Sequence, residues 1–439
     1  MTLRLSVIGT GYLGATHAAC MAELGYEVIG VDVDPAKVAI LKSGRVPFYE
    51  PGLDEVLARN IEAGRLNFTT SITEAAQFAD IHFICVGTPQ MAGAQKADLS
   101  QVMGSIEALA PHLRPGALVV GKSTVPVGTA ALIAERLKAI SVSEVEVAWN
   151  PEFLREGFAV EDTLTPDRLV VGVQSQQAEA RLREVYAPLL AIGTPFLVTD
   201  FPTAELVKVA ANSFLATKIS FINAMAEVCE AAGADVSQLA EAIGYDPRIG
   251  NRFLSAGLGF GGGCLPKDIR AFMARAGELG AEEALTFLRE VDQINLRRRS
   301  HVVDLARAAL GGDFTGKAVT VLGAAFKPNS DDVRDSPSLD VAVAMSNAGA
   351  RVVVHDPKAL ANAAKVYPNM SYEQDVLTAL AGADLILHGT EWTEYRDLNP
   401  ADVAAVVRER HLIDGRNTLD PDAWRNAGFT YRALGRPNA

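Results

Sequence analysis

The sequence predicts an α/β protein with two parallel-sheet domains, joined by a long central α-helix and a small helical domain. Three observations predict this fold. A glycine motif follows an early apolar run, a second set of similar strand ends occurs late in the chain, and a long stretch with helical spacing lies between them. A chain of 439 residues is long enough for two or three domains. We expect them at residues 1–200, 201–300 and 301–439.

Composition excludes several classes of protein. A net charge of −13 argues against a nucleic-acid partner. The four cysteines, Cys20, Cys85, Cys229 and Cys264, are too few and too scattered for a disulfide framework or a zinc site, so we expect no metal and a reducing, cytoplasmic setting. The sequence has no apolar run of about 18 residues, so we expect no membrane span. The first apolar run starts at Leu3 and leads directly into a glycine motif, so we expect no signal peptide.

The first strand is predicted from Leu3 to Ile8, and it runs into Gly9-Thr10-Gly11-Tyr12-Leu13-Gly14. A helical stretch and a second apolar run follow, closed by Asp32, which lies 18 residues after Gly14. Strand, glycine motif, helix, strand and acid together predict a Rossmann-like dinucleotide site. Asp32 would accept hydrogen bonds from a ribose 2′-hydroxyl and repel a 2′-phosphate, which favours NAD over NADP. The alternative is a packing turn that binds no nucleotide.

Two further strands of the same sheet end in polar residues. The run from 81 to 86 leads into Thr88, and the run from 118 to 120 leads into Thr124. Ligands lie off the carboxyl ends of strands in open α/β sheets, so both threonines are candidate cofactor or substrate contacts. The alternative is ordinary turn and capping chemistry. Cys85 within its strand and Cys20 within its helix are expected in the core.

The segment 150–157 reads Asn-Pro-Glu-Phe-Leu-Arg-Glu-Gly. Asn before Pro predicts a short helix, on which Glu152 and Glu156 would face the same way. One interpretation is a carboxylate pair beside an active site, usable as general base. The other is two solvated glutamates.

A helix about 45 Å long is predicted from Pro202 to about Ala232, because the stretch has helical spacing and no internal Gly or Pro. Its length and apolar character suit a spine between domains or a dimer interface. Lys208 and Asn212 are four residues apart and share one face. Together they could hold a sugar hydroxyl or a developing alkoxide. The alternative is a lysine that reaches solvent and an asparagine that caps something local.

The segment 257–268 reads Gly-Leu-Gly-Phe-Gly-Gly-Gly-Cys-Leu-Pro-Lys-Asp. Cys264 follows five glycines and precedes a lysine and an aspartate, which favours a reactive thiol over an inert buried one. Arg248 and Arg252, just ahead, are candidate diphosphate contacts or surface charges. The run Arg297-Arg298-Arg299 is expected to form a solvated helix face.

The carboxyl-terminal half resembles the first. A strand ends at Gly323, a second ends at Asp356, and a third ends at His388 before Gly-Thr, as the strand at 81–86 does. A second, shorter Rossmann-like unit is therefore predicted. Its first turn lacks the G-x-G-x-x-G pattern, so it could hold a mononucleotide. An anion site is predicted there from three cations, Lys327, Arg334 and Arg416. The alternative is that the charges between residues 327 and 335 only balance one another.

These motifs, in this order, resemble the nucleotide-sugar dehydrogenases of the UDP-glucose/GDP-mannose dehydrogenase family. The resemblance runs from end to end and includes Val86-Gly87-Thr88-Pro89, Ser123-Thr124-Val125-Pro126 and Asp414-Gly415-Arg416. It implies oxidation of a sugar C6 alcohol to a carboxylate with reduction of two NAD, most closely on UDP-glucose. It also implies an NAD-binding domain, a central helical domain that forms a homodimer, and a UDP-sugar-binding domain, in that order along the chain.

The resemblance assigns roles to particular residues. Cys264 would be the nucleophile that forms a thiohemiacetal and then a thioester, Lys208 with Asn212 would stabilise oxyanion character, Asp268 with Thr124 would transfer protons, and Glu152 would assist thioester hydrolysis. Implied cofactor contacts are Gly9, Gly11, Tyr12, Leu13, Gly14, Asp32, Lys37, Thr88, Thr124, Glu156, Lys267 and Arg334. Implied substrate contacts are Glu152, Phe153, Leu154, Glu156, Lys208, Asn212, Arg248 from a second subunit, Phe253, Leu254, Ser255, Gly257, Gly261, Lys327 and Arg416.

One departure from the family pattern precedes the nucleophile. Gly263 stands where many relatives carry Ser, which leaves the thiol in place but could change the stiffness of the loop. Two alternatives to UDP-glucose oxidation stay open. The first is a related enzyme that acts on GDP-mannose or another nucleotide sugar. The second is a non-catalytic NAD-binding scaffold on the same fold.

Overall fold

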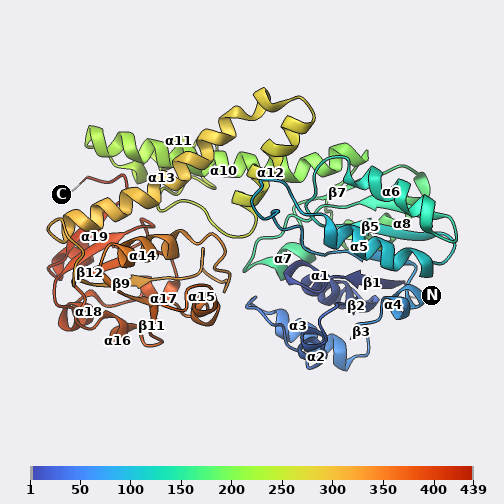
Figure 1. Ribbon diagram of the computed structural model, residues 1–439, viewed down its shortest axis with the longest axis horizontal. Helices are drawn as coiled ribbons and strands as arrows, with labels where there is room; N and C mark the ends of the chain where they lie inside the picture. The colour runs from blue at the N-terminus through green and yellow to red at the C-terminus, as the bar shows by residue number, and fades with distance from the viewer. Residues whose placement is uncertain (1–2, 438–439) are drawn as a thin grey trace. The chain divides into compact units, whose positions relative to one another are not determined.

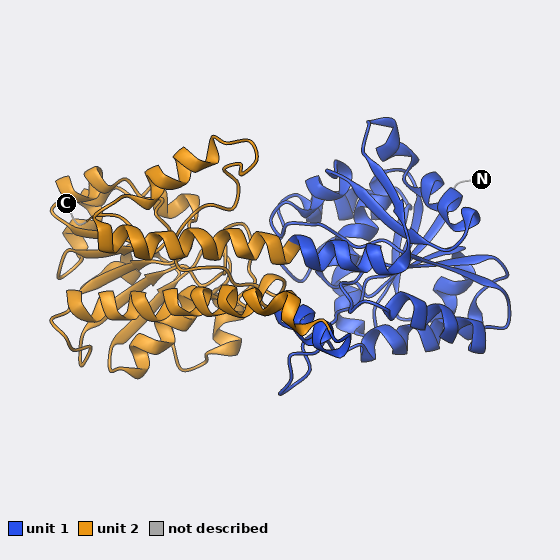
Figure 2. Cartoon of the chain, turned by 90° about the horizontal axis from the view of Figure 1, so that it is seen from above, with its two compact units in different colours: residues 1–211, 270–280 blue, residues 212–269, 281–439 orange. Residues whose placement is uncertain are grey.

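The computed structural model describes residues 3–437 of the chain. These residues form two compact units (Figures 1 and 2). Unit 1 contains the chain up to residue 211 together with residues 270–280. Unit 2 contains residues 212–269 and the chain from residue 281 onward.

Unit 1 is built on an eight-stranded sheet with the strand order β3-β2-β1-β4-β5-β6-β7-β8. All neighbours are parallel except β6 and β7, which are antiparallel. The strands are β1 (Arg4–Ile8), β2 (Glu27–Val31), β3 (Leu66–Thr69), β4 (Ile81–Ile84), β5 (Ala117–Gly121), β6 (Val145–Trp149), β7 (Leu169–Val173) and β8 (Phe196–Thr199). The helices between them are α1 (Tyr12–Glu23), α2 (Pro35–Lys42), α3 (Leu53–Glu62), α4 (Ile72–Phe78), α5 (Ser100–Leu109), α6 (Thr129–Ile140), α7 (Ala159–Leu164), α8 (Gln176–Val185) and α9 (Ala187–Ala191).

Both faces of this sheet are covered, which explains why its strands read as continuous apolar runs rather than as alternating ones. In β1, Leu5 and Val7 point to one face and pack with residues of α1 and α3. Ile8 points to the other face and packs with residues of α4, α5 and α6. The carboxyl ends of β1, β4 and β5 therefore lie in the middle of the sheet edge, with cores above and below them.

Unit 2 repeats the same plan on a smaller, all-parallel sheet with the order β11-β10-β9-β12-β13-β14. Its strands are β9 (Ala318–Leu322), β10 (Arg351–His355), β11 (Ser371–Tyr372), β12 (Leu385–His388), β13 (His411–Asp414) and β14 (Thr430–Ala433). Its helices are α11 (Val236–Gly244), α13 (Thr286–Ala309), α14 (Pro337–Asn347), α15 (Leu360–Val366), α16 (Val376–Leu380), α17 (Thr393–Arg396), α18 (Pro400–Val406) and α19 (Pro421–Asn426). Strand by strand, this order equals that of β1 to β6, so the predicted second Rossmann-like unit is confirmed.

Two helices contain residues of both units: α10 (Phe201–Ala232) and α12 (Leu265–Glu278). The 32 residues of α10 confirm the predicted long central helix. No helix within residues 3–437 is long and apolar enough to cross a membrane.

The expectation of a solvated arginine run on α13 is wrong for two of its three members. Arg298 is fully buried and forms an ion pair with Glu230 at 3.1 Å, and Arg299 is 6% exposed. Arg299 pairs with Asp335 at 2.7 Å and also with Asp340. Opposite charges contributed by α10, by the segment before α14 and by α14 itself allow these cations to be buried. These acidic partners lie outside α13, so the spacing of residues along this helix does not predict them.

Candidate active site

The glycine turn of unit 1 is shaped by contacts that exclude side chains. Gly9 has φ +87°, and a Cβ at this position would lie 2.6 Å from Cγ1 of Val86 on the neighbouring strand end. Helix α1 begins at Tyr12. Its amino cap is Gly11, which has no side chain to accept a hydrogen bond from the first turn. The backbone N–H groups of that turn are therefore available to an anion, which is what a dinucleotide diphosphate requires.

Asp32 follows β2 and is 7% exposed. Its carboxylate accepts bonds from the Thr10 N–H at 3.0 Å and from the Lys37 ammonium at 2.9 Å. Burial alone would raise the pKa of Asp32, but the bonds from Lys37, Asp34 and Thr10 outweigh it and hold the pKa below its usual range. Asp32 is therefore a charged acceptor at the end of β2, as a ribose-binding carboxylate should be.

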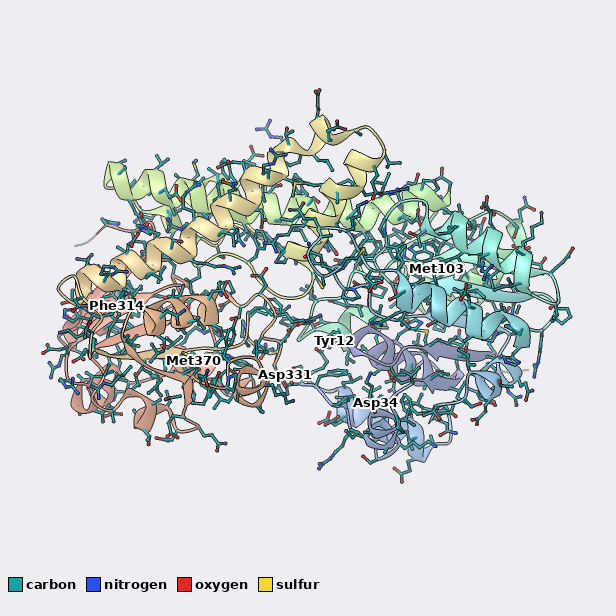
Figure 3. All side chains as sticks on the ribbon, viewed as in Figure 1. Tyr12, Asp34, Met103, Phe314, Asp331 and Met370 are labelled. Atoms are coloured by element: carbon teal, nitrogen blue, oxygen red, sulfur yellow. The ribbon has the colours of Figure 1, made fainter. Side chains whose placement is uncertain are left out.

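A buried carboxylate that the sequence reasoning missed supports the same turn. The Tyr12 hydroxyl donates to Glu50, which is 5% exposed (Figure 3 labels Tyr12). Glu50 also accepts the N–H groups of Gly157 at 2.6 Å and Ala159 at 2.7 Å. Burial, followed by the bond to Glu50, raises the pKa of Tyr12 well above its usual value, so the phenol stays protonated. Glu50 thus ties the start of α1 to the start of α7.

Thr88 and Thr124, predicted from two separate strand ends, are in contact. The Thr88 hydroxyl donates to the carbonyl oxygen of Thr124 at 2.7 Å. Ser123 next to it donates to the carbonyl of Val86 at 2.6 Å. These bonds join the loops after β4 and β5 into one rim at the carboxyl edge of the sheet.

The segment 150–157 is not the helix that Asn before Pro predicts. Its residues form an irregular loop, and α7 starts only at Ala159. Side chains occupy its backbone donors: Glu152 accepts the Leu154 N–H at 2.6 Å, and Asp162 accepts the Arg155 N–H at 2.8 Å. These bonds replace helical ones, so Glu152 and Glu156 are not one turn apart on a helix.

Within this loop, Glu152 forms an ion pair with Lys208 of α10 at 2.9 Å. The Lys208 side chain is 6% exposed and the Glu152 side chain 13% exposed. The Lys208 ammonium also lies 5.7 Å from the centre of the Phe153 ring. Lys208 therefore does not reach solvent, and its burial is explained by a carboxylate partner and an aromatic neighbour.

A second buried cation, missed by the sequence reasoning, lies one residue beyond β5. The Lys122 ammonium, 7% exposed, donates to Oδ1 of Asn150 at 3.0 Å, and the Tyr186 hydroxyl donates to the same oxygen at 2.5 Å. Burial lowers the pKa of Lys122 to about 8, although Cys85 and Glu152 oppose the change. Lys122 thus supports the first residue of the loop that carries Glu152.

In unit 2, Cys264 is exposed and directly precedes α12. Its carbonyl oxygen accepts the Asp268 N–H at 2.8 Å, so the thiol belongs to the residue that caps the helix. A helix amino terminus favours a thiolate over a thiol. The other three cysteines are buried, and burial raises the pKa of Cys85 to about 12. Only Cys264 among the four has the exposure that a nucleophile needs.

Four residues after Cys264, Asp268 is 1% exposed and has a partner on each carboxylate oxygen. The Asn212 side-chain amide donates to Oδ2 at 2.7 Å, and the Lys267 ammonium lies 2.7 Å from Oδ1. Three residues that the sequence reasoning selected separately are therefore brought together by α10 and α12 within unit 2.

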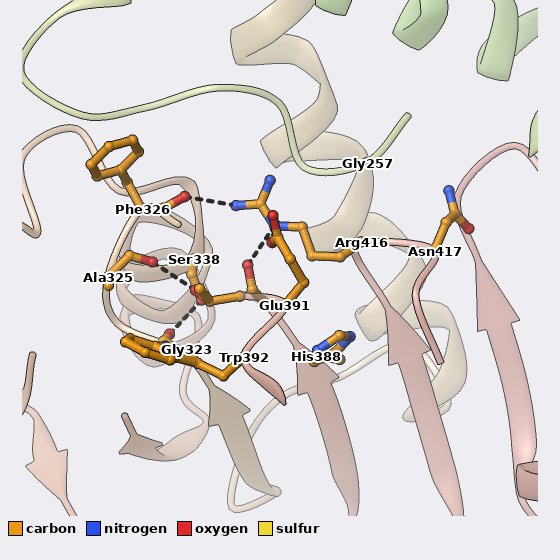
Figure 4. Close-up of polar contacts among 12 residues, drawn as sticks. Gly257, Gly323, Ala325, Phe326, Ser338, His388, Glu391, Trp392, Arg416 and Asn417 are labelled. Carbon is orange, nitrogen blue, oxygen red and sulfur yellow. Dashed lines mark hydrogen bonds and ion pairs between the residues drawn. The ribbon is translucent and has the colours of Figure 1, made fainter. Parts of the chain in front are cut away.

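Arg416, at the end of β13, connects several loops of unit 2 (Figure 4). Its guanidinium donates to the carbonyl oxygens of Gly389 at 2.7 Å, Gly259 at 2.9 Å and Phe326 at 3.3 Å. It also lies 3.3 Å from a carboxylate oxygen of Glu391. All three guanidinium nitrogens of Arg416 thus donate to backbone carbonyl oxygens.

Other residues selected from the sequence lie in different surroundings. Arg248 is highly exposed, with an 87% exposed side chain that pairs with Asp246. Phe253 is exposed and has φ +64°, whereas Leu254 is buried. The Gly257 N–H donates to Asn223 at 2.9 Å. No group of His, Cys, Asp and Glu among the described residues is arranged to hold a metal ion.

Comparison with known proteins identifies the relatives of this chain. Three models of the UDP-glucose/GDP-mannose dehydrogenase family match it: the NAD binding domain over residues 3–190, the central domain over 202–297 and the UDP binding domain over 320–421. A UDP-glucose 6-dehydrogenase of Rhizobium meliloti is 41% identical over 439 residues, which cover 99% of this chain and 100% of the relative.

Two solved structures have the same architecture over nearly their whole length. The UDP-glucose dehydrogenase of Pyrobaculum islandicum has a TM-score of 0.91 and 40% identity, covering 99% of this chain and 98% of its own. A UDP-D-ManNAc dehydrogenase of Pyrococcus horikoshii has a TM-score of 0.88 and 27% identity, covering 100% of both chains.

Proposed function

Because this chain belongs to the UDP-glucose/GDP-mannose dehydrogenase family, we propose that it oxidises UDP-glucose to UDP-glucuronate with two NAD. The chain is a nucleotide-sugar dehydrogenase with an NAD-binding domain. The observation that carries the finer proposal is the exposed Cys264 at the amino end of α12, four residues before the buried carboxylate of Asp268.

The residues of unit 1 fit an NAD molecule. The side-chain-free turn at Gly9 and Gly11 leaves room for a diphosphate, and Asp32 supplies a charged acceptor for ribose hydroxyls. The negative charge of Asp32 disfavours a 2′-phosphate. The dinucleotide, when bound, supplies the acceptor for hydride. The other proposed contacts in this unit are Tyr12, Leu13, Gly14, Lys37, Thr88, Thr124 and Glu156.

The chemistry of the chain itself centres on Cys264. Hydride transfer from the C6 alcohol leaves an aldehyde, and the thiolate adds to its carbonyl carbon to form a thiohemiacetal. Loss of a second hydride from that carbon gives a thioester. Water then attacks the thioester, the C–S bond breaks, and the carboxylate leaves with the thiolate restored.

The resemblance assigns charge stabilisation and proton transfer to further residues of the chain. Lys208, held by Glu152, stabilises oxyanion character, and Asn212 assists it. The resemblance assigns proton transfer to Asp268 and to Thr124. Glu152 directs the water that hydrolyses the thioester. These roles follow the family resemblance, and the buried pairs Lys208–Glu152 and Asn212–Asp268 support them.

We assign recognition of the uridine diphosphate and sugar to the residues implied by the resemblance. Lys327, Arg416 and Gly261 belong to unit 2, as do Phe253, Leu254, Ser255 and Gly257 of the loop before Cys264. The resemblance also assigns substrate contacts to Glu152, Phe153 and Leu154, which belong to unit 1. The three-part division at residues 200 and 300 is proposed on the same basis.

A homodimer through the central helix is also part of the proposal. Phe214, Phe221 and Val228 of α10 recur every seven residues and are 66%, 47% and 57% exposed. Residues with this spacing lie along one face of a helix. A second copy covering this stripe would explain why it is apolar, and would allow the exposed Arg248 to reach the partner's substrate. Sedimentation equilibrium tests this, since a monomer at micromolar concentration would contradict it.

The test of the reaction is stoichiometry. Purified protein with limiting UDP-glucose should form about two NADH per sugar, because four electrons leave one carbon. One NADH per sugar with accumulating aldehyde would contradict the thioester route. The variant Cys264→Ser should lose net formation of UDP-glucuronate, and full activity in that variant would remove the nucleophile assignment.

Substrate choice needs a separate experiment. Catalytic efficiencies for UDP-glucose, GDP-mannose and UDP-N-acetylmannosamine should be highest for UDP-glucose. A preference for either other sugar would move the chain to that branch of the family. Absence of NADH formation with every nucleotide sugar would favour a non-catalytic scaffold.

A further inference from the structure

Three successive glycines before Cys264 each face a different group within residues 326–337. A Cβ on Gly261 would lie 2.7 Å from Cδ of Pro337, and one on Gly262 would lie 2.7 Å from the Phe326 ring. A Cβ on Gly263 would lie 2.6 Å from Nη2 of Arg334 and still closer to the rest of its guanidinium. The glycines therefore form the surface on which residues 326–337 pack.

Arg334 is held against this surface by its own neighbours. Its carbonyl oxygen accepts the Gly262 N–H at 2.9 Å. Its side chain forms a two-pronged ion pair with Asp332, at 2.9 Å from Nε and 2.5 Å from Nη2. The same carboxylate accepts the Arg334 N–H at 2.9 Å. Both the backbone and the guanidinium of Arg334 are therefore oriented within unit 2.

We infer that Gly263 is a positioning residue that admits the Arg334 guanidinium against the peptide before Cys264, so that a cation lies within about 8 Å of the Cα of the nucleophile. The inference deepens the proposed function, because it explains how the thiol that function requires is kept reactive. It also gives a physical reason for a glycine at position 263.

The geometry places this cation within electrostatic reach. Nη2 lies 2.6 Å from the Cβ position of Gly263. One carbon–carbon bond of about 1.5 Å and one Cα–Cα step of about 3.8 Å then put it within about 8 Å of the Cys264 Cα. That is close to one Debye length of about 8 Å at physiological salt. Since the Arg334 side chain is 64% exposed, the effect on the thiolate should be modest and salt-dependent.

The other charges near the loop have partners of their own. Lys267 and Asp268 of α12 form a 2.7 Å pair with each other. Asp335 pairs with Arg299 at 2.7 Å. Asp332 both orients Arg334 and partly offsets its charge, so removing Asp332 is not an equivalent test. Substitution at Gly263 or Arg334 is therefore the more selective change.

Alkylation of Cys264 by iodoacetamide tests the inference without substrate or cofactor. The other cysteines are buried, so the native protein should react at this thiol. We expect Arg334→Gln to slow alkylation at pH 7 by about two- to fivefold and to raise the midpoint of its pH profile. Gly263→Ser should do the same, because a serine side chain displaces the flexible guanidinium. Raising NaCl to 0.5 M should bring the unmodified protein toward both variants.

The double variant makes the test decisive. If serine acts by displacing Arg334, then Gly263→Ser combined with Arg334→Gln should react no more slowly than Arg334→Gln alone. Gly104→Ser is the matched control, because a Cβ there meets nothing within 4 Å. A Gly263→Ser variant that alkylates like the unmodified protein would overturn the inference. Two other results would also overturn it. One is a double variant whose loss of alkylation rate equals the product of the losses in the two single variants. The other is a Gly263→Ser variant that alkylates more slowly with an unchanged midpoint of its pH profile, which indicates that the serine only obstructs the reagent. UDP-glucose turnover is measured separately, so failure of the proposed function would be distinguishable.

Discussion

The buried ammonium of Lys122 offers a quantitative test of the electrostatics of unit 1. Its pKa of about 8 lies about 2.5 units below the ordinary lysine value of 10.5. At about 1.36 kcal/mol per unit, the charged form costs the folded state about 3 kcal/mol relative to the unfolded chain. Lys122→Met removes this cost, and it also removes the bond to Asn150, which is worth about 1 kcal/mol. We therefore expect the variant to be more stable than the unmodified protein by about 2 kcal/mol at pH 7.

The dependence on pH separates this cause from improved packing. Between pH 8 and 10.5 the unfolded chain keeps the Lys122 proton while the folded chain releases it, so the free energy of unfolding rises with pH in the unmodified protein. The advantage of Lys122→Met should therefore shrink by about 3 kcal/mol between pH 7 and pH 10.5, and the variant should end less stable than the unmodified protein. Urea unfolding followed by circular dichroism at several pH values measures both proteins. Exposed Lys138→Met is the control. A stability difference that stays constant from pH 7 to pH 10.5 would refute a depressed lysine pKa.

Two further variants test the glycine turn and the buried arginine of α13. Gly9→Ala should weaken NADH binding at least tenfold, because φ +87° and the 2.6 Å approach to Val86 leave no place for a methyl group. Fluorescence titration measures the affinity, with Gly104→Ala as the control. An unchanged affinity would show that the turn can shift to accept the methyl group. Burial would raise the pKa of Glu230, but His301 and Arg298 lower the pKa to about 2. The charge of Glu230 therefore stabilises the folded state fully above pH 4.5, the ordinary pKa of a glutamate, and this stabilisation is lost as the pH falls toward 2. Glu230→Gln should therefore be less stable at pH 7, with the difference shrinking between pH 4.5 and pH 2.5 in urea unfolding; an unchanging difference would contradict the ion pair as its cause.

Sequence patterns predicted the features that repeat along the chain or that local chemistry determines. The glycine motif with Asp32 predicted the first sheet, the similar strand ends predicted the second, and unbroken helical spacing predicted α10. Each depends on neighbours in sequence, so each could be found from spacing alone.

The errors and omissions arise where partners are distant in sequence. The loop at 150–157 is not helical, because Asp162 and the side chain of Glu152 occupy its donors. Arg298 is buried because Glu230, 68 residues earlier, faces it. Glu50 and Lys122 carry no motif, and their importance appears only through Gly157 and Asn150. A signal that could have indicated Lys122 is a lysine directly after an apolar strand of a doubly covered sheet.

The division of the chain has a consequence for how it folds during synthesis. Unit 1 contains residues 270–280, which follow 58 residues that belong to unit 2. Arg275 from this late segment donates to the Val127 carbonyl at 2.7 Å, and Glu278 pairs with Lys96 at 2.6 Å. A nascent chain ending at residue 211 cannot make these bonds. Unit 1 is therefore completed on the ribosome only after residues 270–280 have been translated, later than the first 58 residues of unit 2.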